Sequence, residues 1–347
     1  MLGDENGASS STTTRVSMIS PEIDARSSKA TSQLAVDPRR IGTFTKVGAN
    51  AKNDKTNQDR GLVCCPFCDA SDALLAIFDG HGKLSEKIAA WAVEQLPVLL
   101  EARKDELTSG DKSASQVLFQ TIVRMDKALL AHEDRALRKA ADSAGTTATI
   151  VYLHDGKLHV ACAGDSRAVL GSDVPGAPAT SNRRGGSQPV VALELTTDHK
   201  PDEPKERTRI EQAGGSITAA SKRQGAARVW AEGCGGMAVS RSLGDGRHKE
   251  TAGVISDPEI HSVELDVSDR FVIVASDGLW EYVTSQEACD VVAKHLKHAR
   301  EASAALVKLA EKRWNARAAE KRAGDTRDDI TVTVALLPLQ AGPTVSA

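Results

Sequence analysis

The stretch LLAIFDGHG, residues 74–82, decides how this chain folds and where its chemistry lies. Its first five residues are apolar, as expected for a buried strand, and the run then stops at Asp79, Gly80, His81 and Gly82. A polar turn explains this ending without any function. The alternative is that the strand carries a metal ligand, Asp79, and a proton-transfer group, His81, into a site. The rest of the chain has to distinguish these two interpretations.

Composition limits the classes of partner. The 347 residues include 44 Lys and Arg against 47 Asp and Glu, a net charge of -3, which provides no electrostatic basis for binding nucleic acid or an anionic membrane. No apolar run approaches the roughly 20 residues of a membrane-spanning helix. Residues 1–15 lack both a signal-peptide core and a glycine directly after the first methionine. We expect a monomer in the cytoplasm and/or nucleus that binds neither nucleic acid nor membrane.

The six cysteines indicate a reducing compartment, because they are too few for a disulfide scaffold in a chain of this length. Three lie together in CCPFC, residues 64–68. This pattern fits half of a zinc site or a cluster of loop thiols. A closed zinc site needs four ligands, and no second pair exists, which favours loop thiols. Each of the other three cysteines stands alone: Cys162, Cys234 and Cys289.

One folded domain is expected over residues 39–340, between an N-terminal tail (1–38) and a C-terminal tail (341–347). The N-terminal tail is rich in Ser, Thr and charge without an apolar period, which is typical of disorder. The Gly-, Pro- and Ser-rich residues 171–189 lie between two strand candidates and predict a flexible loop insertion.

The apolar pattern predicts an α+β fold of mostly antiparallel sheets, because long amphipathic stretches are inserted among consecutive short strands. His-Asp-Gly at 154–156 predicts a hairpin turn, and Ser85 is a possible N-cap of the first helix. The strand candidates are residues 73–79, 146–153, 157–164, 190–196, 259–265, 270–276 and 329–337. The helix candidates are residues 84–101, 113–142, 204–213 and 285–316.

Several aspartates share one context, the end or the start of an apolar strand. They are Asp59, Asp79, Asp165, Asp277, Asp328 and Asp329. A single one would be a cap or turn residue. If the strand ends converge, the carboxylates repel one another unless a divalent cation neutralises them, and oxygen ligands suit Mg²⁺ or Mn²⁺. Gly80, which has no side chain, would let its carbonyl approach the same ion.

Other phosphate chemistries are not supported. The chain has no G-x-x-x-x-G-K-[ST] loop and no G-x-S-x-G elbow. CAGDSR, residues 162–167, is one residue too short for a cysteine-phosphatase loop, and its cysteine lies inside an apolar strand, where a thiol is inert.

Nine motifs in order resemble the metal-dependent protein phosphatases of type 2C. The motifs span roughly residues 41–338 and read NQDR, FDGHG, AGTTATI, ACAGDSRAVL, TTDHKPDEPKERTRIEQAGG, GGMAVSRSLGD, VISDPEI, VIVASDGLWE and RDDITVTV. The resemblance implies a four-layer α-β-β-α sandwich, two packed and mainly antiparallel sheets flanked by antiparallel helix pairs. It also implies hydrolysis of phosphoserine and phosphothreonine in proteins by a metal-bridging hydroxide, without a phosphoenzyme.

The same resemblance implies a set of site residues. Asp79 bridges two Mn²⁺ or Mg²⁺ ions, Gly80 offers its carbonyl to the first, and Asp59 supports that ion through water. Asp277 and Asp328 hold the second ion. A weaker third ion is implied at Asp165, with Glu281 as a further candidate. His81 resembles the general acid that protonates the leaving oxygen.

Some matches are less direct. Many relatives carry an Arg for the substrate phosphate where this chain has Asp54, so the role passes to Lys55, which lacks bidentate geometry. Thr146, Thr147, Arg241 and Asp245 are interpreted as structural. A flap is expected over residues 216–238, in which Trp230 either contacts partners or packs within the flap.

Two other functions stay open at this point. One is a pseudophosphatase that keeps the fold as a binding module, but the complete ligand set argues against it, because unneutralised carboxylates are a liability. The other is a phosphatase of small metabolites, which the sequence distinguishes poorly from a protein phosphatase.

Overall fold

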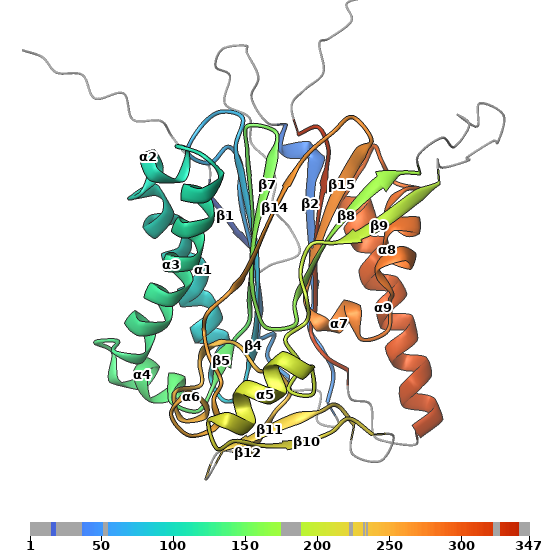
Figure 1. The fold of residues 1–347 in the computed structure, drawn as a ribbon. Helices are drawn as coiled ribbons and strands as arrows, with labels where there is room; N and C mark the ends of the chain where they lie inside the picture. Colours follow the sequence, from blue (N-terminus) through green and yellow to red (C-terminus); the bar gives the residue numbers. More distant parts are fainter. Residues whose placement is uncertain are drawn as a thin grey trace, which may run out of the picture.

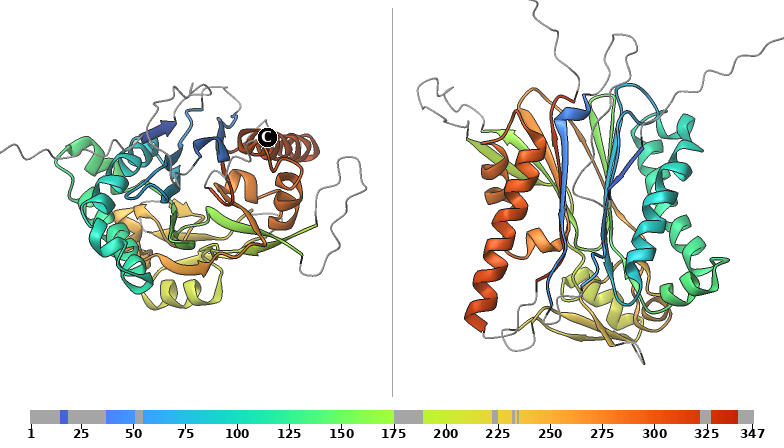
Figure 2. Two further views of the ribbon diagram at one scale, coloured as in Figure 1. Left: turned by 90° about the horizontal axis from the view of Figure 1, so that it is seen from above. Right: turned by 180° about the vertical axis from the view of Figure 1, so that it is seen from behind.

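Two antiparallel sheets pack face to face, and helices cover the outer face of each (Figure 1). The same four layers appear from behind in Figure 2, with a helix layer on each flank. The expected α-β-β-α sandwich is therefore confirmed. The computed structural model describes residues 15–18, 37–50, 55–174, 189–221, 225–231, 233, 235–321 and 327–339. Within these residues, no helix is long and apolar enough to cross a membrane.

The first sheet has its strands in the order β1 (Arg15–Met18), β3 (Asp59–Cys64), β4 (Ala73–His81), β6 (Ala148–His154), β7 (Lys157–Ala163) and β14 (Glu259–Glu264). The short β5 (Gly145–Thr146) joins the end of β4 to β13 (Leu243–Gly244). The outer face is covered by α1 (Ser85–Glu101), α2 (Lys104–Leu107), α3 (Asp111–Leu130) and α4 (Arg135–Ala141).

The second sheet runs in the order β2 (Ile41–Lys46), β16 (Ile330–Leu336), β15 (Asp269–Ala275), β8 (Arg167–Asp173) and β9 (Val190–Glu194), and a 3-10 turn (Pro38–Arg40) leads into β2. Its helices are α7 (Asp277–Trp280), α8 (Ser285–Val292) and α9 (Ala299–Lys321). A small third sheet contains β10 (Ser216–Thr218), β11 (Arg228–Ala231) and β12 (Gly235–Met237), and it lies beside α5 (Pro204–Gln212) and α6 (Gly246–Ala252).

Side-chain alternation along β4 explains both the core and the site. Leu74 and Phe78 point into the core beneath the helices, whereas Leu75 and Ile77 point into the core between the two sheets. Successive residues of a strand alternate between its two faces. Asp79 has the parity of Leu75 and Ile77, so it lies on the inner face where the apolar core ends.

The predicted elements are largely confirmed, with three corrections. The helix predicted over 113–142 breaks at Leu130 and restarts at Arg135, because Asp134 accepts a hydrogen bond from the Ala136 amide and begins a new helix. The helix predicted over 285–316 is likewise divided between α8 and α9, because residues 293–298 form tight turns.

The third correction concerns the start of α1. The N-cap residue is Leu84, in the left-handed conformation, and not Ser85, whose hydroxyl contacts the Gly82 carbonyl. The hairpin turn at 154–156 is confirmed: Asp155 and Gly156 both have positive φ, as a two-residue turn between antiparallel strands requires.

Parts of the predicted tails and insertion lie outside the described residues. The structure describes β1 within the predicted N-terminal tail, paired with β3. Residues 175–188 of the predicted insertion and 340–347 at the C-terminal end are not described. The predicted flap contains β10, β11 and β12, with five of its residues outside the described set.

Candidate active site

Asp59 and Asp79 lie directly opposite each other on neighbouring strands. They are register partners in the antiparallel pair formed by β3 and β4. Residues opposite each other in such a pair share one face of the sheet, so both carboxylates lie on the inner face. The residues between them form the rest of β3, the connection at 65–72 and most of β4, so local sequence order brings this half of the site together.

The second sheet contributes Asp277 and Asp328 to the same place. Asp277 follows β15 as the first residue of α7, and Asp328 stands two residues before β16 begins. Ser276 connects the two sheets, because its hydroxyl donates to Asp59 Oδ2 at 2.7 Å. The four predicted metal-binding aspartates are thus brought together from both sheets.

Electrostatics show how close these carboxylates are. Burial raises the pKa of Asp79 well above its ordinary value, and the charges of Asp59, Asp277 and Asp328 raise it further. Burial and the charges of Asp165 and Asp328 do the same to the pKa of Asp277. For Asp59, burial and the charge of Asp329 raise the pKa to about 7. The cluster therefore holds more negative charge than it can keep without a cation.

The donor set fits hard divalent cations. Asp59 is 3% exposed, and its Oδ1 has no hydrogen-bond partner among the described residues. Buried carboxylate oxygens are normally satisfied by a donor or a metal. The gathered ligand atoms are all oxygens, which favours Mg²⁺ or Mn²⁺ over zinc.

Gly80 and Thr147 hold the backbone around Asp79. The Asp79 amide donates to the Thr147 hydroxyl at 3.0 Å, and the Thr147 amide donates to the Asp79 carbonyl at 2.9 Å. A Cβ on Gly80 would lie 2.8 Å from the Gln58 carbonyl oxygen and 2.9 Å from Ser85 Oγ. Close packing thus gives this glycine a structural reason, and the structural role predicted for Thr147 is confirmed.

His81 is held by an aspartate that the sequence analysis interpreted as structural only. Its Nε2 lies 2.7 Å from Oδ2 of Asp245, which is 1% exposed and also accepts a hydrogen bond from the Ser242 hydroxyl. Burial lowers the pKa of His81, but the Asp245 carboxylate outweighs it, so that the pKa is raised above 6.5. No local pattern predicts this pair, because 164 positions separate its members.

Two lysines already contact the acidic cluster. Lys55 Nζ lies 2.6 Å from Asp328 Oδ1 and 3.4 Å from Asp329 Oδ1. Lys200 forms an ion pair with the buried Asp165, and although burial lowers the pKa of Lys200, the Asp165 charge raises it overall. The structure therefore places Asp165 and Lys55 at the cluster. It also adds Lys200, the cationic partner of Asp165, which the sequence analysis did not identify.

Asp329 is a further residue whose role the sequence analysis missed. Its carboxylate accepts hydrogen bonds from the amides of Gly48 and Gln58, at 2.6 and 2.8 Å. It is 2% exposed and ties two loops to the start of β16. The pattern of aspartates at strand ends includes Asp329. Only the tertiary structure shows that Asp329 binds backbone amides, whereas Asp328 contacts Lys55.

Three other residues singled out in the sequence differ in their burial. Burial raises the pKa of the Cys162 thiol to about 12, which confirms that this thiol is inert. Glu281 is exposed after α7. Trp230 is 42% exposed on β11, and its indole N–H donates to the Thr218 hydroxyl. Both interpretations of Trp230, partner contact and flap packing, remain compatible with this position.

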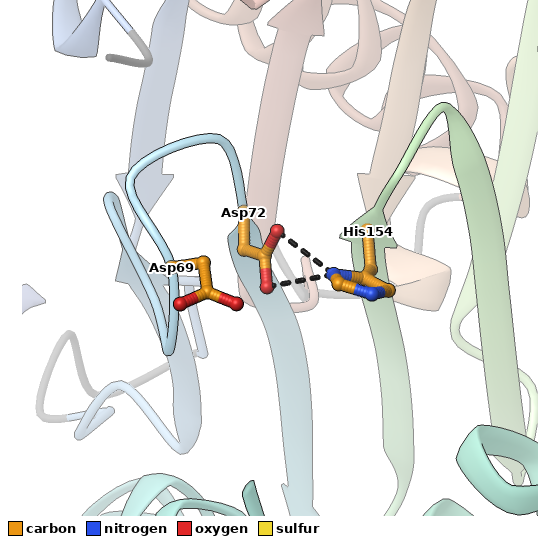
Figure 3. Close-up of side chains that lie close together, drawn as sticks. All are labelled: Asp69, Asp72 and His154. Carbon is orange, nitrogen blue, oxygen red and sulfur yellow. Dashed lines mark hydrogen bonds and ion pairs between the residues drawn. The ribbon is translucent and has the colours of Figure 1, made fainter. Parts of the chain in front are cut away.

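A second group of potential ligands contains Asp69, Asp72 and His154, whose ligand atoms lie within 4.8 Å of one another (Figure 3). Asp72 immediately precedes β4, and seven residues at about 3.3 Å each place it roughly 23 Å from Asp79. This group is therefore separate from the carboxylate cluster.

The side chains of this second group are already paired. The buried Asp72 accepts hydrogen bonds from the Tyr152 hydroxyl at 2.7 Å and from His154 Nδ1 at 3.0 Å. Asp69 forms an ion pair with Lys104 at 2.8 Å. The group is a satisfied polar network that closes this end of the sandwich, and nothing in it requires a cation.

Comparisons with known proteins agree with this geometry. A sequence profile described as protein phosphatase 2C matches residues 45–319. The chain is 34% identical over 302 residues to probable protein phosphatase 2C 48 of Oryza sativa subsp. japonica, covering 83% of this chain and 82% of the relative. It is 31% identical over 304 residues to probable protein phosphatase 2C 41 of Arabidopsis thaliana, covering 83% and 80%.

Solved structures show the same fold. A crystal structure of serine-threonine phosphatase 2C from Toxoplasma gondii superposes with a TM-score of 0.70 at 22% identity, covering 88% of this chain and 96% of that one. A C. elegans sex determining protein superposes with a TM-score of 0.65 at 20% identity, covering 87% and 65%.

Proposed function

The chain belongs to the protein phosphatase 2C family of protein serine/threonine phosphatases, and on this premise we propose that it hydrolyses phosphoserine and phosphothreonine in proteins at the carboxylate cluster. The observation that carries the proposal is the convergence of Asp59, Asp79 and Asp277: the charges of Asp59 and Asp277 raise the pKa of Asp79, and the charge of Asp59 raises the pKa of Asp277. Such an arrangement is costly for folding and serves best as a cation site.

We assign the cluster to two Mn²⁺ or Mg²⁺ ions. Asp59, Asp79, Asp277, Asp328 and the Gly80 carbonyl would hold them, and Asp165 would take part in a weaker third site. When bound, such ions lower the pKa of a coordinated water to make a nucleophile and neutralise charge on the phosphate. Direct attack by water requires no phosphoenzyme, which is consistent with the buried, inert thiol of Cys162.

The chain's own residues perform two further tasks. Lys55, at the edge of the cluster beside Asp328, offers an ammonium group to a phosphate oxygen. His81 donates a proton to the departing Ser or Thr oxygen. Because Asp245 occupies Nε2, the nitrogen that remains for the substrate is Nδ1.

We also propose that the protein acts as a monomer on phosphoproteins in the cytoplasm and/or nucleus. A reducing compartment is supported by its cysteines, since none of the five described ones forms a disulfide.

The decisive experiment measures phosphate release from a phosphothreonine peptide. We expect turnover with Mn²⁺ or Mg²⁺, none in excess chelator, and none in Asp277→Asn. Asp105→Asn serves as the matched control, because Asp105 is exposed on α2, away from the cluster. Turnover that survives chelation, or that Asp277→Asn retains, would exclude the two-metal assignment.

A further inference from the structure

A buried ion pair lies next to Gly244, the residue that precedes Asp245, the partner of His81. Asp126, on α3, pairs with Lys249, on α6. The side chains are 8% and 13% exposed, respectively. Exchanging such a pair for apolar residues is often neutral or even stabilising, so its presence calls for a reason beyond stability.

Asp126 also holds the backbone that precedes Asp245. The Gly244 amide donates to Asp126 Oδ1 at 2.9 Å. Gly244 has φ +83° and Asp245 has φ 52°, so two consecutive residues adopt the left-handed conformation that side chains disfavour. A bond from α3 to this segment stabilises a conformation that the segment does not prefer by itself.

The strand β5 connects this segment to His81. Gly145 is the register partner of both His81, in β4, and Gly244, in β13. A Cβ on Gly145 would lie 2.1 Å from Asp245 Oδ2. The Asp245 carboxylate therefore passes over a bare glycine to reach His81 Nε2 on the far side of β5.

We infer that Asp126, together with Lys249, is a positioning residue that orients His81 through the Gly244 backbone and the Asp245 carboxylate. Asp126 contacts neither the carboxylate cluster nor a substrate, and acts only through this chain of contacts. The inference rests on the proposed role of His81 as proton donor. An ordinary structural staple between α3 and α6 is the alternative.

The test compares two substrates, a phosphothreonine peptide, whose leaving group needs a proton, and an activated aryl phosphate, whose leaving group does not. In Asp126→Ala we expect kcat on the peptide to fall about tenfold, while kcat on the aryl phosphate stays nearly unchanged, because misorientation harms only the step that needs the donor. Asp126→Asn should recover most of the loss, because its amide oxygen still accepts from Gly244.

Two further variants separate positioning from stability. In a His81→Ala background, adding Asp126→Ala should not lower kcat on the peptide any further. Asp142→Asn is the matched control, because Asp142 anchors the same helix α6 through Arg247 at 2.7 Å, but its side chain is 46% exposed. If Asp126→Ala does not fold, Lys249→Met is measured in its place, and kcat on the peptide is expected to fall more than kcat on the aryl phosphate.

Equal losses on both substrates, or losses that add to those of His81→Ala, would overturn the inference in favour of a structural staple. If His81→Ala itself slows both substrates equally, the proton-donor role fails and the inference falls with it. If the wild-type protein hydrolyses neither substrate with Mn²⁺, the proposed function fails first, so the three failures are distinguishable.

Discussion

At the scale of single residues, His81 shows how neighbouring groups determine which atom of a side chain is available for chemistry. Its position after Asp79 and Gly80 brings it to the site, and Asp245 decides which nitrogen is available. A histidine at a strand end is otherwise a common structural residue. In the proposed role as proton donor, the buried carboxylate of Asp245 would define which nitrogen of His81 donates.

The first residue-scale prediction is that His81→Ala slows a phosphothreonine peptide by about 10²-fold or more, while an activated aryl phosphate is much less affected. The measurement is kcat for both substrates under saturating Mn²⁺. The opposite pattern, with the aryl phosphate equally slowed, would show that His81 does not act as the proton donor.

The second residue-scale prediction concerns the Gly80→Ala variant. A Cβ there would meet the Gln58 carbonyl at 2.8 Å, so we expect a loss of roughly 1–3 kcal/mol in the free energy of unfolding and weaker Mn²⁺ binding. Chemical denaturation and calorimetric titration measure the two effects. Gly61→Ala on the neighbouring strand is the control, because its Cβ would make only ordinary contacts at 3.5 Å; equal losses in both variants would contradict the explanation.

At the scale of elements, α5 is fastened to the segment that leads to β13. Glu206 is buried and accepts hydrogen bonds from Arg241 and Ser240, and it pairs with Arg209 at 2.8 Å. Although burial raises its pKa, these partners lower it to about 2. Sequence analysis found α5 from its apolar period but not its anchor, which lies 35 positions away.

Glu206 yields a pH prediction. Its pKa is depressed from 4.5 to about 2 in the folded state, so its stabilising contribution is complete above about pH 4.5 and is lost as the pH falls towards 2. In Glu206→Gln, unfolding between these pH values should take up about one proton fewer than in the wild type. At neutral pH the variant should lose roughly 3–5 kcal/mol, because buried charges lose their partner.

Denaturant unfolding at several pH values, with chelator present throughout, measures both effects. Glu211→Gln is the control, because Glu211 lies on the same helix with a side chain 55% exposed. If Glu206→Gln shows the pH slope of the wild type, the anchoring role assigned to Glu206 is wrong.

At the scale of the whole molecule, the carboxylate cluster exists because two sheets meet. Neither sheet alone gathers more than two of the four predicted metal-binding aspartates. Repulsion between these charges destabilises the fold, and on the proposed assignment bound cations would relieve it. The proposed metal site would therefore link function to stability.

This linkage predicts that Mn²⁺ at a hundred times its Kd stabilises the protein by about 2.7 kcal/mol per site. In Asp79→Asn this stabilisation should disappear. The metal-free variant should at the same time be at least as stable as the metal-free wild type, because one repelling charge is removed. Thermal unfolding with Mn²⁺ or with chelator measures both; a metal-free variant clearly less stable than the wild type would contradict the repulsion.

Local sequence patterns were enough to predict many of the helices and strands and the candidate ligands, but not strands β2, β3 and β8. The alternation in β4 predicts which face Asp79 occupies, and the repeated aspartates at strand ends predict a cation site, because both are local patterns of apolar and polar residues. The helix breaks at Asp134 and before Ala299 were missed, because the amphipathic period continues across them.

Only the tertiary structure decided the partners. Asp245 behind His81, Asp126 behind Asp245 and Lys200 beside Asp165 are separated by 35 to 164 positions from the residues they contact. Pairing of strands and packing of helices bring such residues together, and no local period records those contacts. The sequence provides the histidine at position 81. The fold places Asp245 against its Nε2 and so leaves Nδ1 as the nitrogen available to a substrate.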